Sequence, residues 1–371
     1  METWKKIRLG SACRTNTDSY SPKEKWDFVN YLDTGNITNN TIDSIQFIDL
    51  TKEKLPSRAR RKVRTDSIVY STVRPNQHHF GIIKSQPENF LVSTGFTVID
   101  VDTNVLNADF LYYLLTKNTL VEALHAIAEQ STSAYPSIKP SDIENLEIEI
   151  PDILTQKKIA NILNILDGKV TQNNEINKNL EQQAQAIYQQ MFIENQNPNW
   201  KEGKLSDLVA VKYGKDHKKL DGGCYPVYGS GGIMRYVEKP LYTGESVLIP
   251  RKGTLNNVMY VNGAFWSVDT MFYTEMLRPN IAKFVYHFVK GKDLASLNAG
   301  SAVPSMTTNI LNAMPLYVPD DETLSIFEET VTPMYSQMQE NEKQSANLAN
   351  IRDTLLPRLM SGELEVSDID L

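Results

Sequence analysis

Apolar residues in two stretches of the chain, about 153–193 and 324–359, recur mostly at steps of three and four positions. Such steps align side chains along one side of an α-helix, so each stretch predicts one long helix. The stripe is narrower than the apolar face of an ordinary globular helix, which favours a coiled-coil seam over a helix buried in a single core. The predicted pairing residues are Ile159, Leu166, Val170, Leu180, Ile187 and Met191 in the first stretch and Phe327, Met334, Met338, Leu348, Leu355 and Leu359 in the second.

Both helical stretches contain polar interruptions. Positions 172–175 interrupt the first stripe, and Asn341 and Ser345 interrupt the second. Gly168 and Pro333 lie near corresponding places, and we expect them to bend or split the helices, because proline cannot donate a backbone hydrogen bond.

The chain is an internal repeat. Tyr135-Pro136-Ser137 recurs as Val303-Pro304-Ser305, and the same shift of 168 positions pairs apolar residues as far as Met191 and Leu359. Similarity upstream is looser and needs other shifts, which indicates loops of unequal length. Such self-similarity predicts a repeated architecture.

The regions before each helical stretch have a different pattern. Short β-branched runs bounded by turn residues, such as Phe96–Val101 and Ser246–Ile249, predict strands. We therefore predict an α+β protein with two pseudo-repeated α/β domains, each followed by a long helix. The predicted segments are a first α/β domain at 1–135, a central helical region at 136–199, a second α/β domain at 200–302 and a distal helical region at 303–371.

Composition indicates the cellular compartment and shows how charge is distributed along the chain. The net charge of the 371 residues is −7, but the segments 1–135 and 200–302 are neutral to basic, whereas the two helical segments are acidic. Cys13 and Cys224 are far apart, which indicates reduced thiols, and no apolar run is long enough to span a membrane. We expect a soluble cytoplasmic protein.

No catalytic constellation emerges from the sequence. Asp152 and Asp167-Gly168-Lys169 imitate the acids and lysine of a metal-dependent nuclease, but they fall in helical sequence. The stretch 197–200 resembles a methyltransferase loop only faintly, and the adjacent His78 and His79 lack a companion at ligand spacing. We predict no catalytic residue and no metal site.

Basic residues gather in the two α/β domains. Arginine and lysine bind phosphates, and the planar arginine fork also fits guanine edges. Together with nearby aromatic residues they predict two separate nucleic-acid contacts. The predicted contact residues are Lys52, Lys54, Arg58, Arg60, Arg61, Lys62, Arg64, Arg74 and Asn76 in the first domain and Lys212, Lys215, Lys218, Lys219, Tyr228, Ser230, Arg251 and Lys252 in the second.

Four motifs resemble one family when they are taken together with the repeat. They are the stretches 66–76 (DSIVYSTVRPN), 93–96 (STGF), 225–233 (YPVYGSGGI) with 251–253 (RKG), and 352–364 (RDTLLPRLMSGEL). In this order, over essentially the whole chain, they resemble the specificity subunit of type I restriction–modification systems.

The resemblance implies a fold and a set of partners. Two target-recognition domains would lie at opposite ends of an antiparallel pair of helices, each reading half of a bipartite double-stranded DNA target, with the helices setting the unread spacer. Two modification subunits would dock on the helices with S-adenosylmethionine, and restriction subunits would add ATP- and Mg-dependent activity. The chain itself would hold no cofactor and catalyse nothing.

Two other functions remain open at this point. The chain could serve a stand-alone methyltransferase, or it could be a coiled-coil adaptor whose α/β domains bind proteins. Duplex binding falls steeply with salt, and that response separates a DNA reader from an adaptor.

Overall fold

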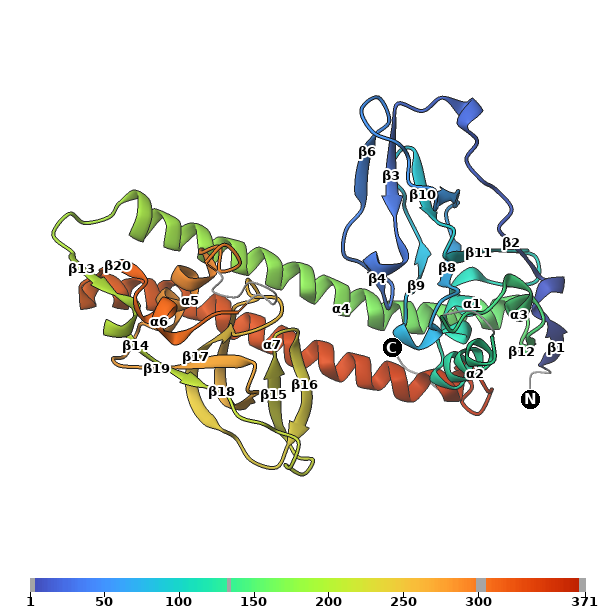
Figure 1. The fold of residues 1–371 in the computed structure, drawn as a ribbon. Helices are drawn as coiled ribbons and strands as arrows, with labels where there is room; N and C mark the ends of the chain where they lie inside the picture. Colours follow the sequence, from blue (N-terminus) through green and yellow to red (C-terminus); the bar gives the residue numbers. More distant parts are fainter. Residues whose placement is uncertain (1–3, 132–134, 298–304, 367–371) are drawn as a thin grey trace. The chain divides into compact units, whose positions relative to one another are not determined.

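The computed structural model describes residues 4–131, 135–297 and 305–366 (Figure 1). The chain forms two compact units, one of Met1–Gln172 with Gln344–Leu371 and one of Asn173–Lys343. Each unit therefore contains one α/β domain and part of each long helix. Val303 and Pro304 of the repeated tripeptide, and the expected boundary at 302, lie outside the described residues.

The first unit contains two four-stranded sheets, ordered β6-β3-β10-β7 and β2-β11-β8-β9. The strands are β1 (Lys5–Arg8), β2 (Cys13–Thr15), β3 (Phe28–Leu32), β4 (Ile37–Thr38), β5 (Thr41–Ile42), β6 (Gln46–Asp49), β7 (Ala59–Arg61), β8 (Ser67–Ser71), β9 (Phe80–Ile83), β10 (Phe90–Ser93), β11 (Phe96–Val101) and β12 (Glu147–Ile150). The helices outside the long pair are α1 (Ala108–Leu115), α2 (Asn118–Glu129) and α3 (Pro140–Glu144).

The second unit is built on one six-stranded sheet, ordered β14-β19-β17-β18-β15-β16. Its strands are β13 (Lys201–Lys204), β14 (Val209–Tyr213), β15 (Tyr225–Gly229), β16 (Gly232–Val237), β17 (Tyr242–Pro250), β18 (Met259–Ser267), β19 (Met271–Met276) and β20 (Pro315–Val318). Its short helices are α5 (Ala282–Lys290) and α6 (Thr308–Asn312).

The β-branched runs form the expected strands. Every residue of β8 is buried, and the first four residues of β11 are buried beside it. β17 is longer than the run Ser246–Ile249 that predicted it, and its last five residues are buried. Alternating burial is absent there because both faces are covered, as is typical of central strands.

Both long helices are continuous. α4 spans Ile153–Tyr188 and is followed by a π-helical turn at Gln189–Glu194, and α7 spans Asp321–Leu359. The expectation that Gly168 and Pro333 would split them is wrong. Both residues are exposed, so water can hydrate the carbonyl that proline leaves unpaired, while Val331 and Tyr335 on either side of Pro333 are buried and hold the helix in place.

The two long helices run antiparallel. In the second unit, Asn173 Nδ2 donates to the carbonyl of Asn341 (3.4 Å) and Asn177 Nδ2 donates to that of Met338 (3.2 Å), so α7 numbers fall as α4 numbers rise. In the first unit, Arg352 of α7 bonds Asp167 of α4 at 2.6 Å. The α+β class with two pseudo-repeated domains and a long-helix pair is confirmed.

The seam positions read from the sequence lie along this pair. In the first unit Ile159, Leu166 and Leu359 are buried, and Val170, Leu348 and Leu355 are half-buried. In the second unit Phe327 is fully buried, and the half-buried positions are Leu180, Ile187, Met191, Met334 and Met338.

One short helix of each unit, α1 or α5, contacts a long helix at an equivalent place. In the first unit the Tyr113 hydroxyl of α1 donates to Asp167 (2.8 Å). In the second unit His287 of α5 meets the Tyr335 hydroxyl at Nε2 (2.8 Å) and Gln185 at Nδ1 (2.7 Å). Burial lowers the pKa of His287 to about 4, so the imidazole is neutral and each nitrogen has one partner.

We expect Leu180→Asp and Leu348→Asp to destabilise the second and first units respectively. The loss should be about 2 kcal/mol or more in each case, because a charge then lies on a half-buried seam. Thermal unfolding of the complete chain measures this. Ile165→Asp is the matched control, since Ile165 lies on α4 but is 49% exposed. Equal melting temperatures for all three variants would remove Leu180 and Leu348 from the seam.

Candidate nucleic-acid interface

Seven lysines and arginines of the first unit lie within residues 52–64, which we call the basic run, and two of these lysines are paired with carboxylates. Lys52 bonds Asp49 at 2.7 Å, and Lys62 bonds Glu24 at 2.5 Å while its ammonium lies 5.3 Å from the Trp26 ring centroid. These pairs reduce the charge that the two lysines present to a phosphate.

The arginines of the same run differ in exposure. Arg61 is half-buried, its buried Nε has no hydrogen-bond partner among the described residues, and burial lowers its pKa. Arg61 therefore suits a structural position better than a surface contact. Besides Lys52, which is paired with Asp49, the exposed members of the run are Lys54, Arg58, Arg60 and Arg64.

Arg74 follows β8 and lies at the junction between the sheet β2-β11-β8-β9 and the segment that leads to α3. Its backbone N–H donates to Pro136 (2.9 Å), and the preceding Val73 forms a β-bridge with Ser137. The exposed guanidinium lies 5.6 Å from the Tyr135 ring centroid, and Arg74 has a left-handed φ of 47°. Asn76 is exposed in the 3-10 turn Pro75–Gln77 that follows.

Arg251 and Lys252 lie at the equivalent junction of the second unit. Lys252 bridges to Ser305, just as Val73 bridges to Ser137, and the Met306 N–H donates to the Arg251 carbonyl (2.9 Å). The Arg251 guanidinium again lies over an aromatic ring, that of Tyr213, at 5.3 Å. Each unit thus has an arginine–aromatic pair at this junction, although the bridges align Val73 rather than Arg74 with the 251–252 segment, and Tyr213 comes from β14.

The turn 267–270 collects further predicted contact residues around Arg251. Three backbone hydrogen bonds show this. The Lys215 N–H donates to the Ser267 carbonyl (2.8 Å), the Val268 N–H to the Tyr228 carbonyl (3.1 Å), and the Arg251 N–H to the Thr270 carbonyl (2.9 Å). Ser230 is close by, because its carbonyl accepts from Asn257 Nδ2 (2.7 Å) in the loop after Lys252. We call Tyr213, Lys215, Tyr228, Ser230, Arg251 and Lys252 the cationic edge.

Tyr213 was missed by the sequence argument. In the sequence, Tyr213 is an aromatic residue directly after Lys212 at the end of a strand. Its contact with Arg251, which follows another strand far along the chain, cannot be predicted from that pattern. Lys212 itself is paired with Glu275 at 3.7 Å, outside the cationic edge. Lys218 and Lys219 are exposed on the loop after β14.

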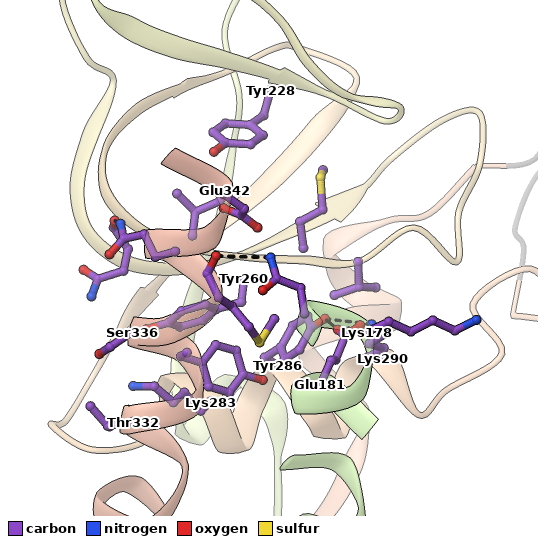
Figure 2. Close-up of a pocket in the computed structure, with 18 of the residues that line it drawn as sticks. Lys178, Glu181, Tyr228, Tyr260, Lys283, Tyr286, Lys290, Thr332, Ser336 and Glu342 are labelled. Carbon is purple, nitrogen blue, oxygen red and sulfur yellow. Dashed lines mark hydrogen bonds and ion pairs between the residues drawn. The ribbon is translucent and has the colours of Figure 1, made fainter. Parts of the chain in front are cut away.

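A pocket of about 500 Å³ lies between β18, α5 and the two long helices of the second unit. In Figure 2, Tyr228 and Glu342 lie at one end and Lys283 at the other. Burial raises the pKa of Tyr228 to about 12, which keeps it a neutral hydrogen-bonding phenol. The pocket therefore adjoins the cationic edge.

The charged groups in the pocket wall are largely paired with one another. Lys283, which is 3% exposed, bonds Glu245 of β17 at 3.0 Å and also Glu328 of α7, and its ammonium lies 5.3 Å from the Tyr260 ring centroid. Glu181 accepts from the Tyr286 hydroxyl and from Lys290. These contacts join β17 to α7 through Lys283 of α5, and α5 to α4 through Glu181.

The acids that imitated a nuclease site have structural partners. Asp152 accepts from the N–H groups of Leu154 (2.8 Å) and Thr155 (3.2 Å) at the start of α4, and Asp167 bonds Tyr113 and Arg352. In the part of the chain that the structure describes, no three His, Cys, Asp or Glu side chains are placed to hold a metal ion. Across 4–131, 135–297 and 305–366, no helix has the length and apolar character needed to cross a membrane.

The chain matches a family model described as the type I restriction modification DNA specificity domain over residues 1–182 and again over 197–347. It is 23% identical to the type I restriction enzyme HindI specificity subunit of Haemophilus influenzae, covering 98% of this chain and 100% of that protein. It is 22% identical to the MjaIX specificity subunit of Methanocaldococcus jannaschii, covering 98% and 94%.

Among solved structures, the S subunit of the type I restriction–modification system from M. genitalium matches with a TM-score of 0.59 at 19% identity. The match covers 96% of each chain. At this identity the likeness concerns the fold.

Proposed function

Because this chain belongs to the specificity-subunit family of type I restriction–modification systems, we propose that each of its two recognition domains reads one half of a bipartite DNA target. The observation that carries the proposal is the arginine–aromatic pair at the same junction of both units, Arg74 with Tyr135 and Arg251 with Tyr213. Two such contacts on one chain suit two separated half-sites on one duplex.

The cationic residues around these pairs would contribute in two ways. Lysines such as Lys215 and Lys252 would neutralise phosphates and set the register, whereas the arginine forks would reach base edges in the major groove. The neutral Tyr228 hydroxyl and Ser230 would add hydrogen bonds that require no charge.

The long helices would set the length of the unread spacer. α4 contains 36 residues. An α-helix rises about 1.5 Å per residue, so a helix of this size is about 54 Å long. Changing that length would change the distance between the two contacts. The acidic segments that contain the helices repel phosphate, so they suit protein partners better than DNA.

Specificity subunits of type I systems are non-catalytic, so the chemistry would come from partners. We propose that two modification subunits dock on the helical regions and hold S-adenosylmethionine for adenine N6-methylation. Restriction subunits would supply ATP- and Mg-dependent translocation and cleavage. No cofactor would bind this chain, and the complex would act in the cytoplasm.

A methylation map tests this function. The chain is expressed with its modification subunit in an unmethylated host, and the genome is sequenced for N6-methyladenine. We expect a bipartite motif with a fixed spacer that disappears when this chain is omitted.

Other maps would point elsewhere. A motif that persists without this chain, or the absence of any motif, would favour the protein-binding adaptor. The same bipartite motif in a complex without restriction subunits would show that the chain is the specificity subunit of a stand-alone methyltransferase.

A further inference from the structure

The edge strand β16 presents large apolar side chains to solvent. Ile233, Met234 and Tyr236 are 51%, 61% and 51% exposed. β16 is the outermost strand of its sheet, so one of its sides has no neighbouring strand in the described part of the unit. Contiguous exposed apolar groups usually mark a binding surface.

Met234 is a β-bulge residue. Arg235 pairs with Val227 and Ile233 pairs with Tyr228, so the register shifts there and Met234 has no residue of its own opposite it. A bulge interrupts the regular strand pairing and changes the direction of a side chain. Bulges are frequent beside functional sites. The bulge sits next to Tyr228, a member of the cationic edge.

Met234 also lies close to the turn that organises the cationic edge. A Cβ placed on Gly229 would be 2.5 Å from Met234 Sδ and 3.9 Å from Val268 Cγ2, so both side chains cover this glycine. Val268 belongs to the turn whose Thr270 carbonyl accepts from the Arg251 N–H. The Met234 side chain therefore lies near the turn to which the Lys215 and Arg251 backbones are bonded.

We infer that Met234, with Ile233 beside it, makes an apolar contact with the bases of the half-site that the second recognition domain reads. The inference deepens the proposed function and depends on it. Lys215 and Arg251 are bonded through their backbones to the adjoining turn, and their charge complements a duplex. Apolar side chains contact thymine methyl groups or press into base steps, and the flexible, polarisable thioether adapts to such surfaces.

The test compares Met234→Ala with wild type in the complex with the modification subunit. Affinity is measured by fluorescence anisotropy for a duplex with the mapped motif and for a scrambled duplex, each at several salt concentrations. We expect about tenfold weaker cognate binding, with unchanged scrambled binding and an unchanged salt slope, because an apolar contact releases no counterions.

Three further variants define the contact. Met234→Leu keeps an apolar side chain and should retain cognate affinity. Leu277→Ala, at a position 58% exposed just beyond the far end of β19, should behave as wild type. Lys215→Ala, in contrast, should lower the slope of log K against log salt by about 0.9 if it removes one phosphate contact.

The results separate this inference from the function beneath it. If wild type does not prefer the mapped motif, the proposed function itself fails. If wild type discriminates and Met234→Ala discriminates equally well, only the apolar contact is overturned. Loss of assembly with intact duplex binding would also overturn it and assign the surface to a protein partner.

Discussion

Replacing Arg74 and Arg251 together by alanine is expected to weaken binding of the cognate duplex roughly 100-fold or more. Each arginine fork that reads a base contributes about 1–3 kcal/mol to recognition. The two side chains belong to different compact units and share no contact partner among the described residues, so their effects should add. Anisotropy titration at fixed salt measures the loss.

The single variants should resolve the two half-sites. Arg74→Ala should relax one half of the methylated motif and Arg251→Ala the other half. Arginine-to-lysine replacements keep the charge but lose the planar fork, so they should preserve the salt slope and still relax the motif. Arg358→Ala is the control, because Arg358 is 46% exposed and paired with Glu363 after α7.

A double variant that binds within twofold of wild type would remove both arginines from the interface. The exposed cations of the first unit, Lys54, Arg58, Arg60 and Arg64, would then be the next candidates there.

The second large effect concerns stability. Lys283→Met is expected to lower the free energy of unfolding of the second unit by about 3–5 kcal/mol, because it removes a buried cation from two half-buried carboxylates. Lys283 is 3% exposed between Glu245 and Glu328, and Glu328 Oε2 already has no hydrogen-bond partner among the described groups. Urea unfolding followed by tryptophan fluorescence measures the change.

Two comparisons make the cause specific. Lys239→Met removes a lysine whose side chain is 63% exposed and whose ammonium lies 3.9 Å from Glu238. Exposed pairs of this kind contribute less than about 1 kcal/mol. Adding Glu245→Gln and Glu328→Gln to Lys283→Met should recover most of the lost stability, because no charge then stays unpaired. If the triple variant is as unstable as Lys283→Met alone, packing rather than charge holds this junction.

Lys283 also links stability to recognition. It holds Glu245 on β17, and β17 ends directly before Arg251 at the cationic edge. Glu245 and Arg251 therefore lie on one continuous stretch of chain, with the buried ion pair at one end and the cationic edge at the other.

Much of the architecture followed from the sequence alone. Apolar residues at steps of three and four predicted two long helices, because a helix places residues at this spacing on one side. Ile159 in α4 and Phe327 in α7 belong to these stripes, and both are buried. The shift of 168 positions required two similar halves, and the structure shows the same β-bridge at Ser137 and Ser305. Local periodicity and repetition are properties of the chain itself, so no tertiary information was needed.

The tertiary structure decided which charges are free and which side chains meet. Lys62 and Arg61 are neighbours in one basic run, yet one is bound to Glu24 and the other is half-buried. Residues of β14 and β15 and of the loops that follow β14, β15 and β17 form the cationic edge, and the bulge that exposes Met234 depends on the partner strand β15. Ion pairing, burial and register arise between segments far apart in the chain, and a residue pattern along one segment carries no record of its neighbours in space.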